Sequence, residues 1–333
     1  MKEQAIDSLK KFWFVILVGC IFIGFAIYFA YDTNKDKIPG KSVDGKDVIF
    51  SAADVDYTAD EYYQSLFNTD SDGTKSGVSL LYVLLEKSVA EQLDSTDKME
   101  ESVEETTKSM EEYYQSVYAD NYESYMNTQM KAMGYDGVED LEQFLLDQAK
   151  LDKIVASYIK KHPDLIKEVF ESESPRVISH ILIKCEDPDN PTAEETAKME
   201  KVKKALDKGT AFTKVAKKYS DDSSKTSGGS LGLKLKSDSL VDEFKTAAWN
   251  LKAGEMSDWV KSEYGYHLIL IDETKQDKIM KNETYASTIN SKILTNNANM
   301  KKQIVWNKAK KLGIKINDKD LKKELMTYIG VEK

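Results

Sequence analysis

The stretch Arg176-Val-Ile-Ser-His-Ile-Leu-Ile-Lys184 decides the fold of the middle of the chain. Its apolar and β-branched residues are typical of a strand buried in the centre of a sheet. A second run of the same kind, His267-Leu-Ile-Leu-Ile-Asp272, closes the same region. Two such strands with helical sequence between them predict a compact α+β unit over residues 174–273, with a small antiparallel or mixed sheet and surrounding helices.

Three helices are predicted between these strands, and the last of them presents Phe244, Ala248 and Leu251 on one face. Thr192 and Glu195 have the spacing of a capping box, which starts a helix, and Gly209 supplies the left-handed residue that ends it. A shorter helix is predicted from four apolar residues at helical spacing, namely Phe212, Val215, Ala216 and Tyr219. Helices with one apolar side can cover the sheet and bury a core of its own.

The composition argues against several classes of function. The 333 residues are 41% hydrophobic and 31% charged, with 16 Gly and 5 Pro, which does not fit collagen-like or low-complexity chains. A net charge of −10 does not favour nucleic-acid binding, and with Arg176 as its only arginine the chain cannot build forked phosphate clamps. Two cysteines and three histidines exclude a Cys-rich metal centre and leave little for zinc. We therefore expect no metal and no cofactor.

The N-terminus predicts a membrane anchor. Residues 12–31 carry no charge, and twenty residues of helix span the hydrocarbon core of roughly 30 Å, so residues 1–11 would form a cytoplasmic tail. Leu17-Val-Gly-Cys20 also resembles a lipoprotein box, in which the chain is cut before Cys20 and the thiol carries lipid. Lysines flank the span on both sides and do not orient it. Either anchor keeps the rest of the chain on one side of a membrane.

Helical patterns flank the α+β unit on both sides. Residues 32–173 predict a mostly helical region, with a long acidic, Tyr-rich helical stretch from about Asp97 to Met133. Residues 51–126 hold 18 acidic residues and 4 lysines, whereas residues 274–333 hold 14 lysines and 6 acidic residues. The opposite charges favour packing of a helical C-terminal segment on the N-terminal region. The alternative is two separately solvated surfaces.

Six short motifs within residues 175–273 occur in one order. They are His180-Ile-Leu-Ile-Lys184, Phe212-x-x-Val-Ala-x-x-Tyr-Ser-Asp-Asp-Ser223, Gly228-Gly-x-Leu-Gly232, Leu240-x-x-x-Phe244, Leu251-x-x-Gly-Glu-x-Ser257 and Tyr264-Gly-Tyr-His267. In this combination the segment resembles the parvulin family of peptidyl-prolyl isomerases. The whole chain, with an anchor and two flanking helical regions, resembles the PrsA-type foldases, extracytoplasmic folding factors of Gram-positive bacteria.

The resemblance implies a domain organisation and partners. Residues 32–173 and 274–333 would form one chaperone domain, and a parvulin domain at 174–273 would be inserted in it. The bulk of the chain would lie at the outer face of the cytoplasmic membrane. Its partners would be unfolded or partly folded secreted proteins with X-Pro bonds, and a homodimer through the helical domain is a further expectation.

The resemblance also implies a pocket for the proline ring. It would be lined by Leu231, Leu240 and Phe244. Apolar residues at this spacing also suit an ordinary core, so both interpretations stay open at this point.

The polar part of the implied site has four members: His180, Asp222, Ser262 and His267. The two histidines would lie side by side on neighbouring strands in a shared hydrogen-bond chain, and they could orient the site or simply hold the sheet together. Asp222 would place a carboxylate opposite the prolyl carbonyl, although its Ser-Asp-Asp-Ser context also suits a turn. Ser262 would support the second histidine with its hydroxyl.

Two functions follow from the resemblance. The first is an active prolyl isomerase and chaperone. The alternative is a membrane-anchored holdase whose parvulin module is catalytically silent, and a non-enzymatic envelope scaffold is the weakest interpretation. The loop Cys185-Glu-Asp-Pro-Asp-Asn190 is acidic, whereas phosphate-directed parvulins have a basic loop here, so we expect no requirement for phosphorylated substrates.

Overall fold

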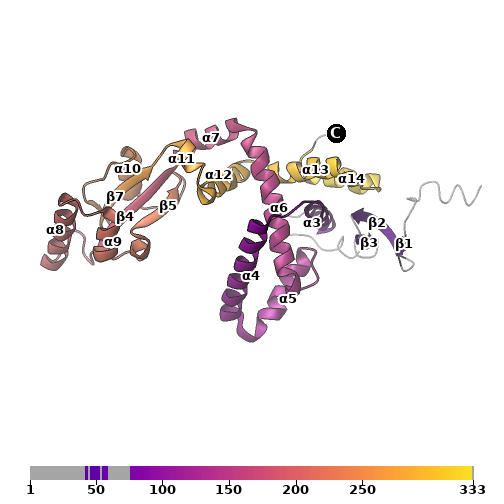
Figure 1. Ribbon diagram of the computed structural model, residues 1–333, viewed down its shortest axis with the longest axis horizontal. Helices are drawn as coiled ribbons and strands as arrows, with labels where there is room; N and C mark the ends of the chain where they lie inside the picture. The colour runs from indigo at the N-terminus through magenta and orange to yellow at the C-terminus, as the bar shows by residue number, and fades with distance from the viewer. Residues whose placement is uncertain (1–41, 44–45, 53–54, 59–75, 332–333) are drawn as a thin grey trace, which may run out of the picture. The chain divides into compact units, whose positions relative to one another are not determined.

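The computed structural model describes residues 42–43, 46–52, 55–58 and 76–331 (Figure 1). This part of the chain is mostly helical and divides into two compact units. One unit consists of the described residues up to 152 together with those from 302 onward, and the other consists of residues 153–301. Among the described residues, no helix has the length and apolar character that a bilayer crossing requires. The predicted tail, anchor and Cys20 lie outside these residues.

The unit formed by residues 153–301 contains a four-stranded antiparallel sheet. Its strands are β4 (Arg176–Lys184), β5 (Ser230–Lys234), β6 (Val260–Ser262) and β7 (Gly265–Glu273). They are arranged in the order β5-β4-β7-β6, so the two runs that predicted buried strands form the central pair. The helices of this unit are α7 (Pro163–Glu173), α8 (Ala193–Asp207), α9 (Phe212–Tyr219), η3 (Ser223–Ser227), α10 (Asp242–Asn250), α11 (Gln276–Ile279) and α12 (Glu283–Asn296).

The three predicted helices between the central strands are confirmed. In α8, Thr192 and Glu195 form the reciprocal capping box, and Gly209 takes the left-handed conformation just past the helix end, with φ of 80°. The second predicted helix is α9, and the third is α10.

Apolar clusters cover both faces of the sheet, because successive side chains of a strand point to opposite faces. One cluster contains Ile181, Ile183, Val202, Val215, Ala216 and Leu268, from β4, β7, α8 and α9. The other contains Ile178, Phe244, Ala248, Ile269 and Ile271, from β4, β7 and α10. The second cluster is the one that adjoins the two histidines.

Segments outside the predicted range 174–273 also belong to this unit. Glu173, at the end of α7, accepts hydrogen bonds from Lys292 Nζ of α12 at 2.7 Å and from the backbone N of Ser237 at 2.8 Å. Partial burial acts to raise the pKa of Glu173, but these hydrogen bonds lower it below its usual value. The carboxylate therefore stays charged and ties α7 and α12 to the segment that follows β5.

The other unit is helical, with a small sheet near its start. Its strands are β1 (Ser42–Val43), β2 (Lys46–Ala52) and β3 (Val55–Thr58), paired in that order and antiparallel. Its helices are α3 (Ser76–Glu91), α4 (Asp97–Tyr118), η1 (Ala119–Asn121), α5 (Tyr122–Ala132), η2 (Val138–Asp140) and α14 (Lys319–Tyr328). Two more helices, α6 (Leu141–Lys160) and α13 (Met300–Leu312), belong partly to this unit and partly to the unit of residues 153–301. The C-terminal α14 packs on α3, and the rings of Tyr82 and Tyr328 lie 5.9 Å apart.

The predicted helical stretch from Asp97 to Met133 is two helices rather than one. The chain breaks at Ala119, which has φ of 44°, and α5 returns alongside α4 (Figure 1). The hairpin is held from within by tyrosines, because the rings of Tyr118 and Tyr125 stack with centroids 4.0 Å apart across the turn. The turn contains neither Gly nor Pro, and its only turn-favouring residues are Asp120 and Asn121.

Candidate active site

Two buried histidines lie side by side at the centre of the sheet. In the register of β4 and β7, His180 pairs with Ile269 and Leu182 pairs with His267, so the two histidines share one face. Their ring centroids are 5.7 Å apart with an interplanar angle of 17°, and each residue is 5% exposed. The two rings thus lie side by side on neighbouring strands, as the resemblance implied.

The implied hydrogen-bond chain between the two rings is absent from the described atoms. Neither His180 Nδ1 nor His267 Nδ1 has a hydrogen-bond partner in the described part of the chain. The polar contacts of the two rings lie elsewhere: His180 Nε2 is next to Asp222 and His267 Nε2 is next to Ser262.

Phe244 of α10 packs against both histidine rings. Its ring meets His180 edge to face at 5.6 Å and His267 at 5.4 Å, and the residue is 3% exposed. Leu231 of β5 and Leu240, just before α10, are partly buried and pack on the same cluster. The structure thus brings the three proposed pocket residues together beside the histidines. It also shows that Phe244 is a core residue of the domain.

Asp222 lies against the other side of His180. Its Oδ1 is 3.1 Å from His180 Nε2, and it accepts a hydrogen bond from the backbone N of Ser224 at 2.8 Å as the N-cap of η3. Partial burial acts to raise the pKa of this carboxyl, but the hydrogen bonds from Ser224 and the contact with His180 lower it to about 2. Asp222 is therefore a carboxylate at neutral pH.

The loop that carries Asp222 is fixed to β4. The Ser220 hydroxyl accepts a hydrogen bond from the backbone N of Leu182 at 3.1 Å, and the backbone N of Asp221 donates to Leu182 O at 2.8 Å. The Asp221 side chain points elsewhere and pairs with Lys198 Nζ at 2.5 Å. Of the two adjacent acids, only Asp222 contacts a histidine.

Ser262 holds the second histidine. Its Oγ is 2.7 Å from His267 Nε2, and it also accepts a hydrogen bond from the backbone N of Tyr264 at 3.2 Å. Burial, reinforced by the neighbouring His180, lowers the pKa of His267 to about 4. The His267 imidazole is therefore neutral at physiological pH.

This lowered pKa predicts acid sensitivity of the fold. An unfolded chain takes up a proton on His267 near pH 6.5, while the folded chain does so only near pH 4, so the unfolded state binds more protons between these values. Stability is complete above pH 6.5 and falls as the pH drops toward 4. We expect the free energy of unfolding to fall by roughly 1–2 kcal/mol more between pH 7 and 5 in the parent than in His267→Gln. Urea unfolding at both pH values measures this, and parallel curves would contradict it.

Arg176 is a positioning residue that sequence analysis missed. Its guanidinium donates hydrogen bonds to the carbonyls of Ala248 at 2.7 Å, Trp249 at 3.0 Å and Leu251 at 2.5 Å, at the C-terminal end of α10. Unpaired carbonyls and the negative end of the helix dipole favour a cation there. The chain's only arginine thus anchors the helix that carries Phe244. An isolated arginine at a strand start is the only sequence signal for it.

The described residues contain no group of three or more His, Cys, Asp or Glu arranged to hold a metal ion. The site consists of a carboxylate, two imidazoles and a hydroxyl above an apolar floor.

A small sheet with paired histidines, a loop acid and an apolar floor defines a parvulin-type peptidyl-prolyl isomerase domain. Residues 180–273 match the Rotamase family, described as the PPIC-type PPIASE domain. The chain is 32% identical over 290 residues to the foldase protein PrsA of Geobacillus kaustophilus, covering 84% of this chain and 90% of that one. It is 37% identical over 187 residues to PrsA of Bacillus subtilis, covering 54% and 60%. The chain belongs to the PrsA foldase family.

Solved structures give a further comparison. The crystal structure of PrsA from Bacillus subtilis aligns with a TM-score of 0.47 at 29% identity, covering 84% of this chain and 98% of that one.

Proposed function

We propose that this chain catalyses cis/trans isomerisation of X-Pro peptide bonds at the site formed by Asp222, His180, His267 and Phe244. The observation that supports this most directly is the ionised Asp222 carboxylate 3.1 Å from His180, beside the apolar floor that Phe244 provides. Ser262 completes the site by holding His267.

Isomerisation of an X-Pro bond requires only that these residues are correctly placed and correctly charged. The trans preference of an X-Pro bond is only about 0.5–1 kcal/mol, but the barrier is about 18–20 kcal/mol because rotation destroys the amide resonance. No bond breaks and no proton has to move. In the planar amide the carbonyl oxygen carries partial negative charge, so a facing carboxylate disfavours that form relative to the twisted one. The apolar residues Leu231, Leu240 and Phe244 would hold the proline ring away from water.

Nuclear magnetic resonance exchange in a short unphosphorylated Ala-X-Pro peptide tests this proposal. The fragment Asp32–Lys333 should speed cis/trans exchange at substoichiometric concentration. Absence of acceleration by a folded fragment would favour the alternative, a holdase with a silent parvulin module. Suppression of client aggregation would then be the relevant assay.

Phosphorylation of the substrate should not increase turnover. The loop after β4 contains Glu186, Asp187 and Asp189, and Asp189 pairs with Lys261, the nearest basic side chain on β6. A phosphate near these carboxylates would be repelled. We expect kcat/KM for a phosphoserine-proline peptide to be no higher than for its serine-proline counterpart, measured by the same exchange method. A clear preference for the phosphorylated peptide would contradict this prediction.

We further propose that the chain acts on secreted proteins at the outer face of the cytoplasmic membrane. The uncharged span at residues 12–31 and membership of the PrsA foldase family support this location. Whether the span stays in the membrane or Cys20 is lipidated, and whether the helical unit dimerises, remain predictions from the sequence. Mass spectrometry of the chain extracted from membranes separates the two anchors, because cleavage before Cys20 removes residues 1–19 and adds lipid.

A further inference from the structure

The outer face of α4 presents large apolar side chains to solvent. Tyr113 is 61% exposed and Val117 is 53% exposed, and the two lie one helical turn apart on the same face. Exposed residues of this size occur singly on many surfaces, but here they adjoin a hollow.

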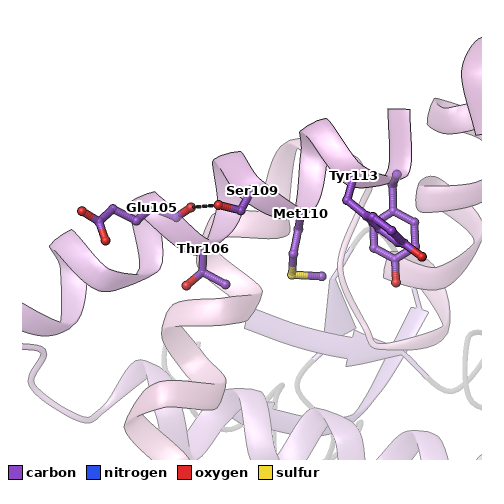
Figure 2. Close-up of a pocket in the computed structure, with 6 residues that line it drawn as sticks. Glu105, Thr106, Ser109, Met110 and Tyr113 are labelled. Carbon is purple, nitrogen blue, oxygen red and sulfur yellow. Dashed lines mark hydrogen bonds between the residues drawn. The ribbon is translucent and has the colours of Figure 1, made fainter. Parts of the chain in front are cut away.

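The hollow lies along the same helix. It has a volume of about 440 Å³, opens widely to solvent, and is lined by Glu105, Thr106, Ser109, Met110, Tyr113 and Tyr114. Figure 2 shows the Met110 side chain lying between Thr106 and the Tyr113 ring. A thioether beside a tyrosine ring forms an adaptable apolar floor, which accepts side chains of varied shape. We call Tyr113, Val117 and the hollow the α4 face.

Tyrosines behind the α4 face hold it rigid. The Tyr113 ring meets Tyr114 edge to face at 5.3 Å, Tyr114 lies 6.0 Å from Tyr118, and Tyr118 stacks on Tyr125 at 4.0 Å. Tyr114, Tyr118 and Tyr125 pack in turn on the buried cluster around Met126 and Met130. Binding to a surface that is already ordered costs little conformational entropy.

The α4 face is strongly acidic at its edges. The helix carries seven Asp or Glu residues and two lysines. Glu105 lines the hollow and Glu112 precedes Tyr113, and none of the ion pairs in the described part of the chain uses either of them. Exposed carboxylates at both ends of the hollow favour cations, and the face of the Tyr113 ring also attracts a cation.

We propose that the α4 face binds polypeptide segments in which lysine or arginine adjoins an aromatic or branched apolar side chain. The apolar side chain occupies the hollow over Met110, and the cations of the segment flank it, one at Glu105 at one end of the hollow (Figure 2) and one at Glu112 beside Tyr113. This proposal rests on the proposed foldase function, since unfolded clients expose such segments. It adds a charge preference to that function and assigns it to a surface outside the isomerase domain.

A proline-free peptide pair tests the α4 face without engaging the isomerase site. The probes are fluorescein-labelled Ala-Lys-Phe-Lys-Leu-Lys-Ala and the same peptide with each Lys replaced by Glu. With the full chain in a non-ionic detergent, fluorescence anisotropy should show about tenfold tighter binding of the lysine peptide. The double variant Tyr113→Ser/Val117→Ser should lose about tenfold in affinity, and Glu105→Gln/Glu112→Gln should lose most of the charge preference.

Tyr158→Ser is the matched control, because Tyr158 is a 37% exposed helical tyrosine outside the α4 face, and its affinity should equal that of the parent. Equal affinity of the parent and the double variant would overturn the proposal. Concentration-dependent self-association that the double variant abolishes, without peptide binding by the parent, would also overturn it and assign the face to a second copy of the chain.

A different experimental result would contradict the proposed isomerase and foldase function. Prolyl exchange by the double variant should equal that of the parent, since no α4 residue belongs to the isomerase site. A parent that binds the lysine peptide but neither speeds exchange nor suppresses client aggregation would contradict the foldase proposal and leave the α4 site intact.

Discussion

Replacing Asp222 by alanine should lower kcat/KM for a proline peptide by about 10- to 100-fold, as expected when a group that stabilises the transition state electrostatically is removed. The carboxylate is the only negative charge in contact with the histidine pair among the described residues, and its pKa of about 2 keeps it ionised at every pH at which the enzyme would work. Its partial exposure sets the lower end of the range, because water screens a charge that it can reach. Exchange spectroscopy of the fragment Asp32–Lys333 measures the effect.

Two further variants separate the effect of the Asp222 charge from the effect of Asp222 on the stability of the domain. Asp222→Asn retains an oxygen that can accept the hydrogen bond from the backbone N of Ser224, so it should keep the N-cap of η3 and the domain's stability while losing the charge. Asp221→Ala removes the adjacent acid, whose partner is Lys198 rather than a histidine. We expect low activity in the first and near-parent activity in the second. Equal activity of Asp222→Asn and the parent would exclude an electrostatic role for Asp222.

Replacing Phe244 by alanine should affect both stability and activity. The ring is 3% exposed, touches both histidines and packs on Ile178, Ile269 and Ile271. Removing a buried phenylalanine ring from a core costs about 3–5 kcal/mol. The same truncation removes the floor on which the proline ring would rest, so kcat/KM should fall by about 100-fold even where the domain stays folded.

The opposite face of the sheet supplies the control. Phe212 of α9 is partly buried against the cluster that contains Ile181 and Ile183, away from the histidines. Phe212→Ala should therefore destabilise the domain, as urea unfolding would show, and leave kcat/KM of the folded protein near that of the parent. If both variants lose activity only in proportion to their loss of folded protein, Phe244 is a core residue alone.

The sequence predicted the isomerase domain well because its signals there are local. The β-branched runs gave the two central strands, and the capping box at Thr192 fixed the start of α8 to the residue. The site residues were accessible only through the resemblance, since nothing in the spacing of His180, Asp222 and His267 shows that β4 and β7 pair in the register that unites them.

Features without a local signal were missed or incorrectly predicted. The helical pattern continues through Ala119, where Asp120 and Asn121 give only a weak turn signal, and the stacking of Tyr118 on Tyr125 joins residues that meet only in the closed hairpin. The role of Arg176 depends on carbonyls that lie more than seventy residues downstream, at Ala248 and Leu251. The hydrogen-bond chain that was expected between the two imidazoles depends on ring orientation, on which sequence carries no information.

The strand order β5-β4-β7-β6 determines when the histidine pair can form during synthesis of the chain. His180 lies on the first strand of the sheet to appear and His267 on the last, and the register between them closes a loop that contains almost the whole domain. Closing so long a loop delays native pairing relative to the formation of local helices. A newly made copy therefore passes through a period in which local helical turns can form but the histidine pair does not exist. Until β7 has paired with β4, the newly made copy lacks the complete candidate site.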